Sequence, residues 1–381
     1  MSVSGPRGFR SFGVACGLKS DKLDLALVQN LGPKFDFAAV LTTNEVKAAP
    51  VLWTSQISRT KKAKAVLLNS GGANACTGPA GFAVTHQSAE YLAEKLNLAA
   101  IDIAVCSTGI IGEQLNFSKI SSGIDALTSS TVDDGSKAAQ AIMTTDSVPK
   151  EVLIHGNGFS IGGMAKGAGM LAPSLATMLV VLTTDADVSQ LNLESILQSV
   201  VNRTFNRISS DGCTSTNDSV LLLANGSSGV VASPEDFEIV LSQACDSLAR
   251  QLIQDAEGAT VLVEIVVDGA KSEDQAEVIA KKVASDSLVK TAIFGRDPNW
   301  GRVAAAVGAA GAGIDPDRLD IYFNGVPLCI NGIANGDRHR ISLDTNQLEI
   351  RIALNQGDSA IKFFTTDLST TYVLENSEYS S

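Results

Sequence analysis

Two residues near the middle of the chain could do chemistry together, a lysine and a threonine separated by 177 − 166 = 11 positions. Lys166 is a lone cation in an otherwise uncharged, glycine-dense stretch, and Thr177 follows a small residue, Ala176. A hydroxyl beside an uncrowded carbonyl is what an attack on the main chain requires. The plainer interpretation is that the glycines permit close packing and positive φ angles, with Thr177 an ordinary strand residue. Pattern alone leaves both interpretations open.

A nucleotide-binding loop is the first alternative for this stretch. Residues 167–172 satisfy the pattern G-x-G-x-x-G/A, but a dinucleotide site needs a helix directly after it, inside a strand–helix–strand unit. Only five residues, one of them Pro173, separate Ala172 from Met178, which opens an apolar run. A Walker loop fails as well, because glycine follows Lys166. The sequence therefore argues against nucleotide binding here.

Strands and helices must position these residues. Short runs of branched apolar residues, typical of strands, alternate along the chain with segments of helical periodicity. The runs predict strands at 24–28, 38–41, 64–68, 101–106, 178–182, 259–267, 319–323, 348–354 and 360–365. Helical periodicity appears around 89–96, 237–253, 273–284 and 303–310. Ser233 followed by Pro234 predicts the N-terminus of the second of these helices. We expect an α/β or α+β layered fold in which helices sandwich mixed sheets.

Composition excludes several classes of protein. The chain has 381 residues, of which 45% are hydrophobic, so it can bury a large core and is not generally disordered. Its length indicates two domains or one composite domain. A net charge of -12 and an aromatic content of 5% disfavour general nucleic-acid binding.

Metal and membrane sites are not expected either. The six cysteines form no CxxC pair, and the three histidines are isolated. No run of signal-peptide type follows Met1, and no stretch reaches the roughly 18 apolar residues of a membrane span. We expect a cytoplasmic protein with reduced thiols, no metal, and no membrane or nucleic-acid partner.

The central stretch and eight further motifs resemble one family. Residues 166–179 read Lys166-Gly-Ala-Gly-Met-Leu-Ala-Pro-Ser-Leu-Ala-Thr-Met-Leu179. The other motifs are Gly8-Phe9, Lys47-Ala-Ala-Pro50, Asn69-Ser-Gly-Gly-Ala-Asn74, Ser107-Thr-Gly109, Met143-Thr-Thr-Asp146, Thr214-Ser-Thr-Asn-Asp218, Glu257-Gly-Ala-Thr260 and Asp297-Pro-Asn-Trp-Gly-Arg302, and the tail Asn376-Ser-Glu-Tyr-Ser-Ser381 matches too. These motifs and their order along the whole chain resemble those of the ornithine acetyltransferases, the bifunctional glutamate N-acetyltransferases of arginine biosynthesis.

The resemblance implies a precursor that cleaves itself between Ala176 and Thr177. An α chain, 1–176, and a β chain, 177–381, would result, assembled as α2β2. Cleavage would also solve a chemical problem, because a threonine hydroxyl is a poor nucleophile at neutral pH. Once cleaved, Thr177 carries a free α-amine with a reference pKa of about 7.7–8.0, which can take the proton of its own hydroxyl.

The implied reaction is ping-pong acetyl transfer. N-acetylornithine acylates Thr177 and ornithine leaves, after which glutamate takes the acetyl group as N-acetylglutamate. No cofactor is implied, and use of acetyl-CoA as a co-substrate stays open. Thr108 and Gly109 match the family's oxyanion hole; on their own they are equally a turn that ends a strand.

Substrate-binding residues carry over by position from the same resemblance: Thr144, Lys166, Thr177, Glu257, Asn376 and Ser381. Lys166 suits a substrate carboxylate as a point charge. Glu257 suits the ornithine ammonium, although a solvated helix end is its plainer interpretation. The roles of Asn376 and Ser381 imply that the C-terminal tail folds back over the site, where a polar terminus would normally fray.

Two alternatives remain for the function. A threonine-nucleophile amidase or aminopeptidase would use the same groups but pass the acyl group to water. An uncleaved binding protein would run as one full-length band on a denaturing gel.

Asp211 and Asp218 flank Cys213 and the polar residues after it. That segment is either a polar network behind the site or a simple turn, and we favour a structural role.

Overall fold

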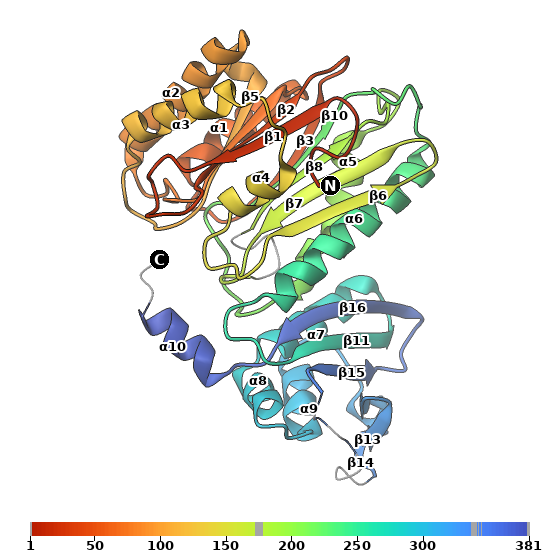
Figure 1. Ribbon diagram of the computed structural model, residues 1–381. Helices are drawn as coiled ribbons and strands as arrows, with labels where there is room; N and C mark the ends of the chain where they lie inside the picture. Colours follow the sequence, from red (N-terminus) through yellow and green to blue (C-terminus); the bar gives the residue numbers. More distant parts are fainter. Residues whose placement is uncertain (1, 172–177, 337–340, 342, 344, 379–381) are drawn as a thin grey trace.

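The computed structural model describes residues 2–171, 178–336, 341, 343 and 345–378, which form three sheets with helices packed against them (Figure 1). The first sheet has the order β1-β2-β4-β5, with β4 and β5 parallel and the other neighbours antiparallel. Its strands are β1 (Phe9–Val14), β2 (Leu25–Asn30), β4 (Ala65–Asn69) and β5 (Ile103–Ser107). The helices that contact them are α1 (Ala49–Thr60), α2 (Gly78–Leu96), α3 (Phe117–Ser129) and α4 (Gly135–Ala141).

The second sheet has the order β3-β10-β8-β7-β6. Its strands are β3 (Asp36–Leu41), β6 (Lys150–His155), β7 (Ser160–Lys166), β8 (Leu179–Thr184) and β10 (Ser219–Ala224). Two helices pack on its outer face, α5 (Leu193–Arg203) and α6 (Pro234–Gln254). β8 and β10 are parallel, whereas β7 is antiparallel to both of its neighbours, β6 and β8.

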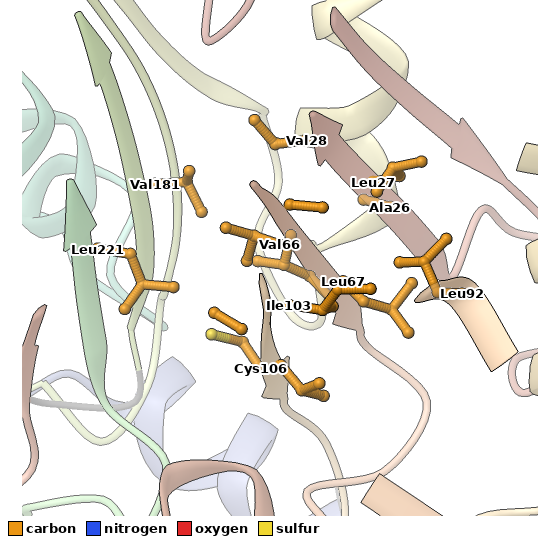
Figure 2. Close-up of a cluster of buried hydrophobic side chains, with 14 of the residues drawn as sticks. Ala26, Leu27, Val28, Val66, Leu67, Leu92, Ile103, Cys106, Val181 and Leu221 are labelled. Carbon is orange, nitrogen blue, oxygen red and sulfur yellow. The ribbon is translucent and has the colours of Figure 1, made fainter. Parts of the chain in front are cut away.

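The first and second sheets pack face to face through a buried apolar core (Figure 2). Val66 and Cys106 of the first sheet point toward Val181 of β8 and Leu221 of β10, and Leu92 of α2 covers the opposite face of the first sheet. Because side chains alternate along a strand, the apolar strands of the second sheet bury one face here and the other against α5 and α6. The result is a helix–sheet–sheet–helix stack.

The third sheet lies beyond α6 and has the order β14-β13-β12-β15-β11-β16-β9. Its strands are β9 (Ile208–Ser209), β11 (Leu262–Ala270), β12 (Asp320–Phe323), β13 (Val326–Ile330), β14 (Ile333–Ala334), β15 (Gln347–Ala353) and β16 (Ser359–Thr366). Helices α7 (Glu273–Ser285), α8 (Ser287–Phe294) and α9 (Trp300–Ala309) share its core. Helix α10 (Thr370–Glu378) then returns toward the first two sheets (Figure 1). Single 3-10 turns cover Ala100–Asp102, Phe205–Arg207 and Pro316–Arg318.

The predicted start of α6 is confirmed, and its cause is local. The Ser233 hydroxyl accepts a hydrogen bond from the Asp236 N–H at 3.1 Å, and Pro234 takes the first helical position. Acidic residues fill the first turn, which favours the positive end of the helix dipole. The helix then runs 21 residues and carries the chain from the second sheet to the third.

The layered α/β fold is confirmed, and so are the strands expected at the positions of β2, β3, β4, β5, β8, β11, β12, β15 and β16. The sequence missed β1, β6, β7, β9, β10, β13 and β14. Of these, β7 bears most directly on the site, and every residue of Ser160–Lys166 is buried in the middle of the second sheet. Its two central glycines hide the branched-apolar signal by which strands are recognised. The expected division into 1–176 and 177–381 stays a prediction, since residues 172–177 lie outside the described residues.

Leu92→Ala should destabilise the protein by about 2–5 kcal/mol, because the side chain is fully buried between α2 and the first sheet. The measurement is the midpoint of urea unfolding. Leu52→Ala in α1 is the matched control, since Leu52 is 45% exposed. Equal midpoints for the two variants would contradict the packing described above.

Candidate active site

A cavity of about 150 Å3 lies where β5 and β7 end and β10 begins, beside α10. Segments far apart in the chain contribute to it. Its lining consists of Ala73, Thr108, Gly109, Ile111, Thr144, Thr145, Lys166, Gly169, Met170, Asp211, Cys213, Ser215, Thr216, Asn217, Glu257, Tyr372 and Asn376. The structure thus brings together six of the residues that the sequence selected: Thr108, Gly109, Thr144, Lys166, Glu257 and Asn376.

Thr108 and Gly109 follow β5 directly and form one wall. The Thr108 main chain is held by two hydrogen bonds, from its N–H to the Asn69 carbonyl at 2.9 Å and from the Gly72 N–H to its carbonyl at 3.0 Å. Gly109 has a φ of +126°, and a Cβ there would approach the Gly72 nitrogen to 2.7 Å, so glycine is required. A buried hydroxyl and a glycine main chain at a strand end can act as donors toward a reacting oxygen.

Lys166 is the last residue of β7 and only 1% exposed. Its Nζ donates a hydrogen bond to the Thr108 hydroxyl at 3.3 Å. Burial lowers the pKa of Lys166, and the carboxylates of Asp146, Asp218 and Glu257 oppose that shift. An ammonium that keeps its proton here offers a positive charge to an anion in the cavity.

Glu257 lies just after α6 and also lines the cavity. Its Oε1 accepts a hydrogen bond from the Thr145 hydroxyl at 2.7 Å, and its Oε2 accepts one from Asn376 Nδ2 at 3.0 Å. The carboxylate rests on Gly169, because a Cβ at that glycine would lie 2.3 Å from Oε2. Asn376 belongs to α10, so the C-terminal segment takes part in the site.

The segment 211–217 forms another part of the cavity wall. Asp211 accepts hydrogen bonds from the Met170 N–H at 2.7 Å and the Cys213 N–H at 3.0 Å, and burial raises its pKa. Asn217 Nδ2 donates to the carbonyls of Ala73 at 2.6 Å and Ser107 at 2.8 Å, which ties this segment to the end of β5. The segment lines the cavity, which the sequence interpretation of it as structural did not anticipate.

Asp218 is a fully buried carboxyl group immediately before β10. Its Oδ1 accepts a hydrogen bond from the Met178 N–H at 3.0 Å, whereas Oδ2 has no hydrogen-bond partner within the described part of the chain. Burial raises the pKa of Asp218 well above its ordinary value, which favours the neutral acid. This group therefore sits beside the residue that follows Thr177 in the chain.

Three of the selected residues, Ala176, Thr177 and Ser381, lie outside the described residues. Sequence reasoning assigned no role to Thr145, Asp146 or Asn217, which the structure places in or directly behind the cavity. Thr145 and Asp146 belong to the Met143–Asp146 motif, so the motif carried a signal, but spacing could not tell which of its side chains face the cavity.

Neither a metal centre nor a membrane-crossing helix appears in residues 2–171, 178–336, 341, 343 and 345–378. No group of three or more His, Cys, Asp and Glu side chains is arranged there to hold a metal ion. No helix in these ranges is both long and apolar enough to cross a membrane.

Two solved structures are similar to the chain in sequence. The ornithine acetyltransferase of Mycobacterium tuberculosis, solved in complex with ornithine, is 54% identical; the match covers 46% of this chain and 96% of that one, with a TM-score of 0.45. The arginine biosynthesis bifunctional protein ArgJ of Bacillus halodurans is 33% identical; the match covers 52% of this chain and 97% of that one, with a TM-score of 0.48.

Full-length relatives extend the similarity to the whole chain. The arginine biosynthesis bifunctional protein ArgJ of Mycobacterium leprae is 52% identical over 389 residues, covering all of this chain and 96% of its own. The protein of the same name from Thermobifida fusca is 48% identical over 383 residues, covering both chains entirely. The ArgJ family model matches residues 10–381. Because this match and these relatives span nearly every residue, the chain belongs to the ArgJ family, the bifunctional acetyltransferases of arginine biosynthesis.

Proposed function

We propose that this protein transfers the acetyl group of N2-acetyl-L-ornithine to L-glutamate through an acetyl ester on Thr177, giving L-ornithine and N-acetyl-L-glutamate. The observation that carries the proposal is the cavity, in which Thr108 and Gly109, the Lys166 ammonium and the Glu257 carboxylate line one small space. Family membership supports acetyl transfer over the alternative of a threonine-nucleophile hydrolase.

The chain first cleaves itself between Ala176 and Thr177. The Thr177 hydroxyl attacks the Ala176 carbonyl carbon, the C–N bond breaks as the nitrogen takes up a proton, and water hydrolyses the resulting ester. The new α-amine then serves as the base for its own hydroxyl. Support comes from the flanking strands: β7, β6 and β3 precede the bond and β8 and β10 follow it, yet all five share one sheet. The two fragments would stay joined by that sheet.

Acetyl transfer then proceeds in two half-reactions. In the first, the Thr177 hydroxyl attacks the acetyl carbonyl of N-acetylornithine, and ornithine leaves with the proton that its amine needs. In the second, the glutamate amine attacks the acetyl-threonine ester and releases the Thr177 hydroxyl. Thr108 and Gly109 stabilise the oxyanion that forms in each half-reaction. Thr108 suits this role because its hydroxyl accepts from Lys166 and so keeps its own proton for another acceptor.

Charge complementarity fixes the orientation of the amino-acid substrates. The Lys166 ammonium binds the α-carboxylate, with Thr144 beside it, and the Glu257 carboxylate binds the ornithine side-chain ammonium. Asn376 holds Glu257 through its Oε2 and closes the site from α10. Ser381 completes the tail in this proposal. An acidic and a basic side chain that line one cavity suit a substrate that carries both charges.

The remaining features of the proposal concern assembly and setting. The α and β chains pair as α2β2, and the enzyme works in the cytoplasm on small molecules, without a cofactor. Acetyl-CoA is a further acetyl donor to test, by supplying it with glutamate in the absence of N-acetylornithine. N-acetylglutamate production under those conditions would add a synthase activity, and its absence would restrict the enzyme to recycling acetyl groups.

Thr177→Ala should remain a single full-length chain and show no acetyl transfer, because it lacks the attacking hydroxyl. Intact-mass spectrometry of the wild type should show a fragment that begins Thr-Met-Leu-Val. Thr177→Ser keeps a hydroxyl and should still be cleaved. Two fragments from the alanine variant, or N-acetylglutamate formed by it, would remove Thr177 from both roles. Free acetate in place of N-acetylglutamate from the wild type would favour the hydrolase.

Thr108→Ala should lower kcat about 10²–10³-fold, as loss of one oxyanion donor does elsewhere, with a much smaller change in KM. Rates are measured on the cleaved fraction, so that any effect on self-cleavage is separated from catalysis. Thr108→Ser retains the hydroxyl and should recover most of the rate. A kcat within threefold of wild type for the alanine variant would show that this hydroxyl does not hold the oxyanion.

Gly169→Ala should raise KM for N-acetylornithine about tenfold or more, because the new methyl group occupies the place of the Glu257 carboxylate. The displaced atoms are the far end of a side chain, so the thermal midpoint should change little. Gly308→Ala in α9 is the matched control, since a Cβ there meets nothing within 4 Å. An unchanged KM would mean that Glu257 does not bind this substrate from its present position.

A further inference from the structure

Two side chains with no exposed surface lie behind the cavity wall, Asp146 and Lys150. Lys150 Nζ donates to Asp146 Oδ1 at 2.6 Å and to Asp255 Oδ2 at 2.5 Å, so a single ammonium bridges two carboxylates. Neither Asp146 nor Lys150 lines the cavity itself. Buried ion pairs contribute little net stability compared with apolar packing, so a role in fixing geometry is a better explanation for this one.

Asp146 uses both of its carboxylate oxygens to hold main chain on two sides of the site. Oδ2 accepts a hydrogen bond from the Thr144 N–H at 2.9 Å, and Oδ1 accepts one from the Gly167 N–H at 2.6 Å. Gly167 directly follows Lys166 at the end of β7. One carboxylate therefore sets the spacing between the segment that carries Thr144 and the strand that carries Lys166.

Lys150, at the start of β6, extends this connection to a third segment. Its second partner, Asp255, caps the C-terminus of α6 and stands two residues before Glu257. Asp255 Oδ2 also accepts a hydrogen bond from the Ser147 N–H at 3.0 Å, and Oδ1 accepts one from the Ser147 hydroxyl. The loop between Thr144 and Lys150 is thereby fixed to the end of the helix from which the Glu257 segment begins.

The same network acts on Lys166 through its charge. Burial alone would raise the pKa of Asp146, but the ammonium groups of Lys166 and Lys150 outweigh it and hold that pKa at about 2. Asp146 is the strongest of the groups that oppose the fall in the pKa of Lys166 on burial. The other titratable groups facing Lys166 are Lys150, Asp218, Glu257 and, from the β1–β2 connection, Lys19.

From these contacts we propose that Asp146, Lys150 and Asp255 form a brace, with the first two side chains fully buried, that positions Thr144, Lys166 and Glu257 for substrate binding. All three members are positioning residues: each acts through the main chain or the charge of a neighbour. The inference rests on the proposed function, because it assumes that Lys166 and Glu257 bind the amino-acid substrate. In this proposal, side chains outside the cavity set the affinity of the enzyme for that substrate.

Asp146→Asn tests both actions of the brace. The substitution replaces one accepting oxygen of Asp146 with an NH2 group. That group cannot accept a hydrogen bond from the main-chain N–H or the Lys150 ammonium that donates to this oxygen in the wild type. The negative charge beside Lys166 is lost as well. We expect KM for N-acetylornithine to rise about tenfold or more while kcat falls less. Lys166 binds a carboxylate only when protonated, so activity falls as pH rises through its pKa. Without Asp146 that pKa is lower still, and the basic limb of kcat/KM should move down by about one pH unit.

Asp255→Asn separates geometry from charge. Asp255 is not among the strongest influences on the pKa of Lys166, so this variant should raise KM and move the basic limb much less than Asp146→Asn does. Asp187→Asn is the matched control, because it breaks an ion pair with Lys34 that is remote from the cavity lining and should change neither quantity. The paired outcome, a KM effect in both brace variants and a pH effect mainly in one, is not expected of a merely destabilised protein.

The wild type is measured first, for chain cleavage and for N-acetylglutamate production from N-acetylornithine and glutamate. No product from the wild type would overturn the proposed function. If the wild type is active but Asp146→Asn keeps its KM and its pH profile, the brace is overturned while the function stands. If Asp146→Asn does not fold, Asp255→Asn decides, since an unchanged KM in that variant contradicts the brace as well.

Discussion

The site depends on the face-to-face packing of two sheets. Their shared core is a single cluster of buried apolar side chains, which fixes one sheet against the other, and the ends of β5 and β7 and the start of β10 meet beside one cavity. Asn217 secures this meeting point through its two hydrogen bonds to the carbonyls of Ala73 and Ser107. A shift of one sheet against the other would separate Thr108 from Lys166, which now lie within hydrogen-bond distance.

Burial of charge gives the cavity its chemistry. Two aspartates close to it respond in opposite directions: the pKa of Asp218 is raised well above its ordinary value by burial, whereas that of Asp146 is held at about 2. The Lys166 ammonium influences both groups, but Asp146 is also in contact with the Lys150 ammonium, whereas one oxygen of Asp218 has no hydrogen-bond partner in the described part of the chain. Two carboxyl groups of one residue type can thus stand ready as an anion and as a neutral acid.

The arrangement of strands also explains how a chain could break in its middle and keep its shape. β7 and β8 lie side by side, paired from Ile161–Thr184 to Lys166–Leu179, although one precedes and the other follows the proposed cleavage point. The ladder, the core between the sheets and the packing of α6 do not depend on the connection between these strands. Cleavage would therefore free an α-amine at little cost in folded structure.

The sequence by itself determined the layered fold class, nine of the strands and the start of α6, because these depend on local composition, periodicity and capping. Its motifs also selected Thr108, Gly109, Thr144, Lys166, Glu257 and Asn376, all of which line the cavity. Tertiary structure alone decided that glycine-rich β7 is a central strand, since burial on both faces, which no local pattern records, makes it one. It alone also paired Lys150 with Asp255, because a hydrogen bond between residues 105 positions apart depends on how strands and helices pack.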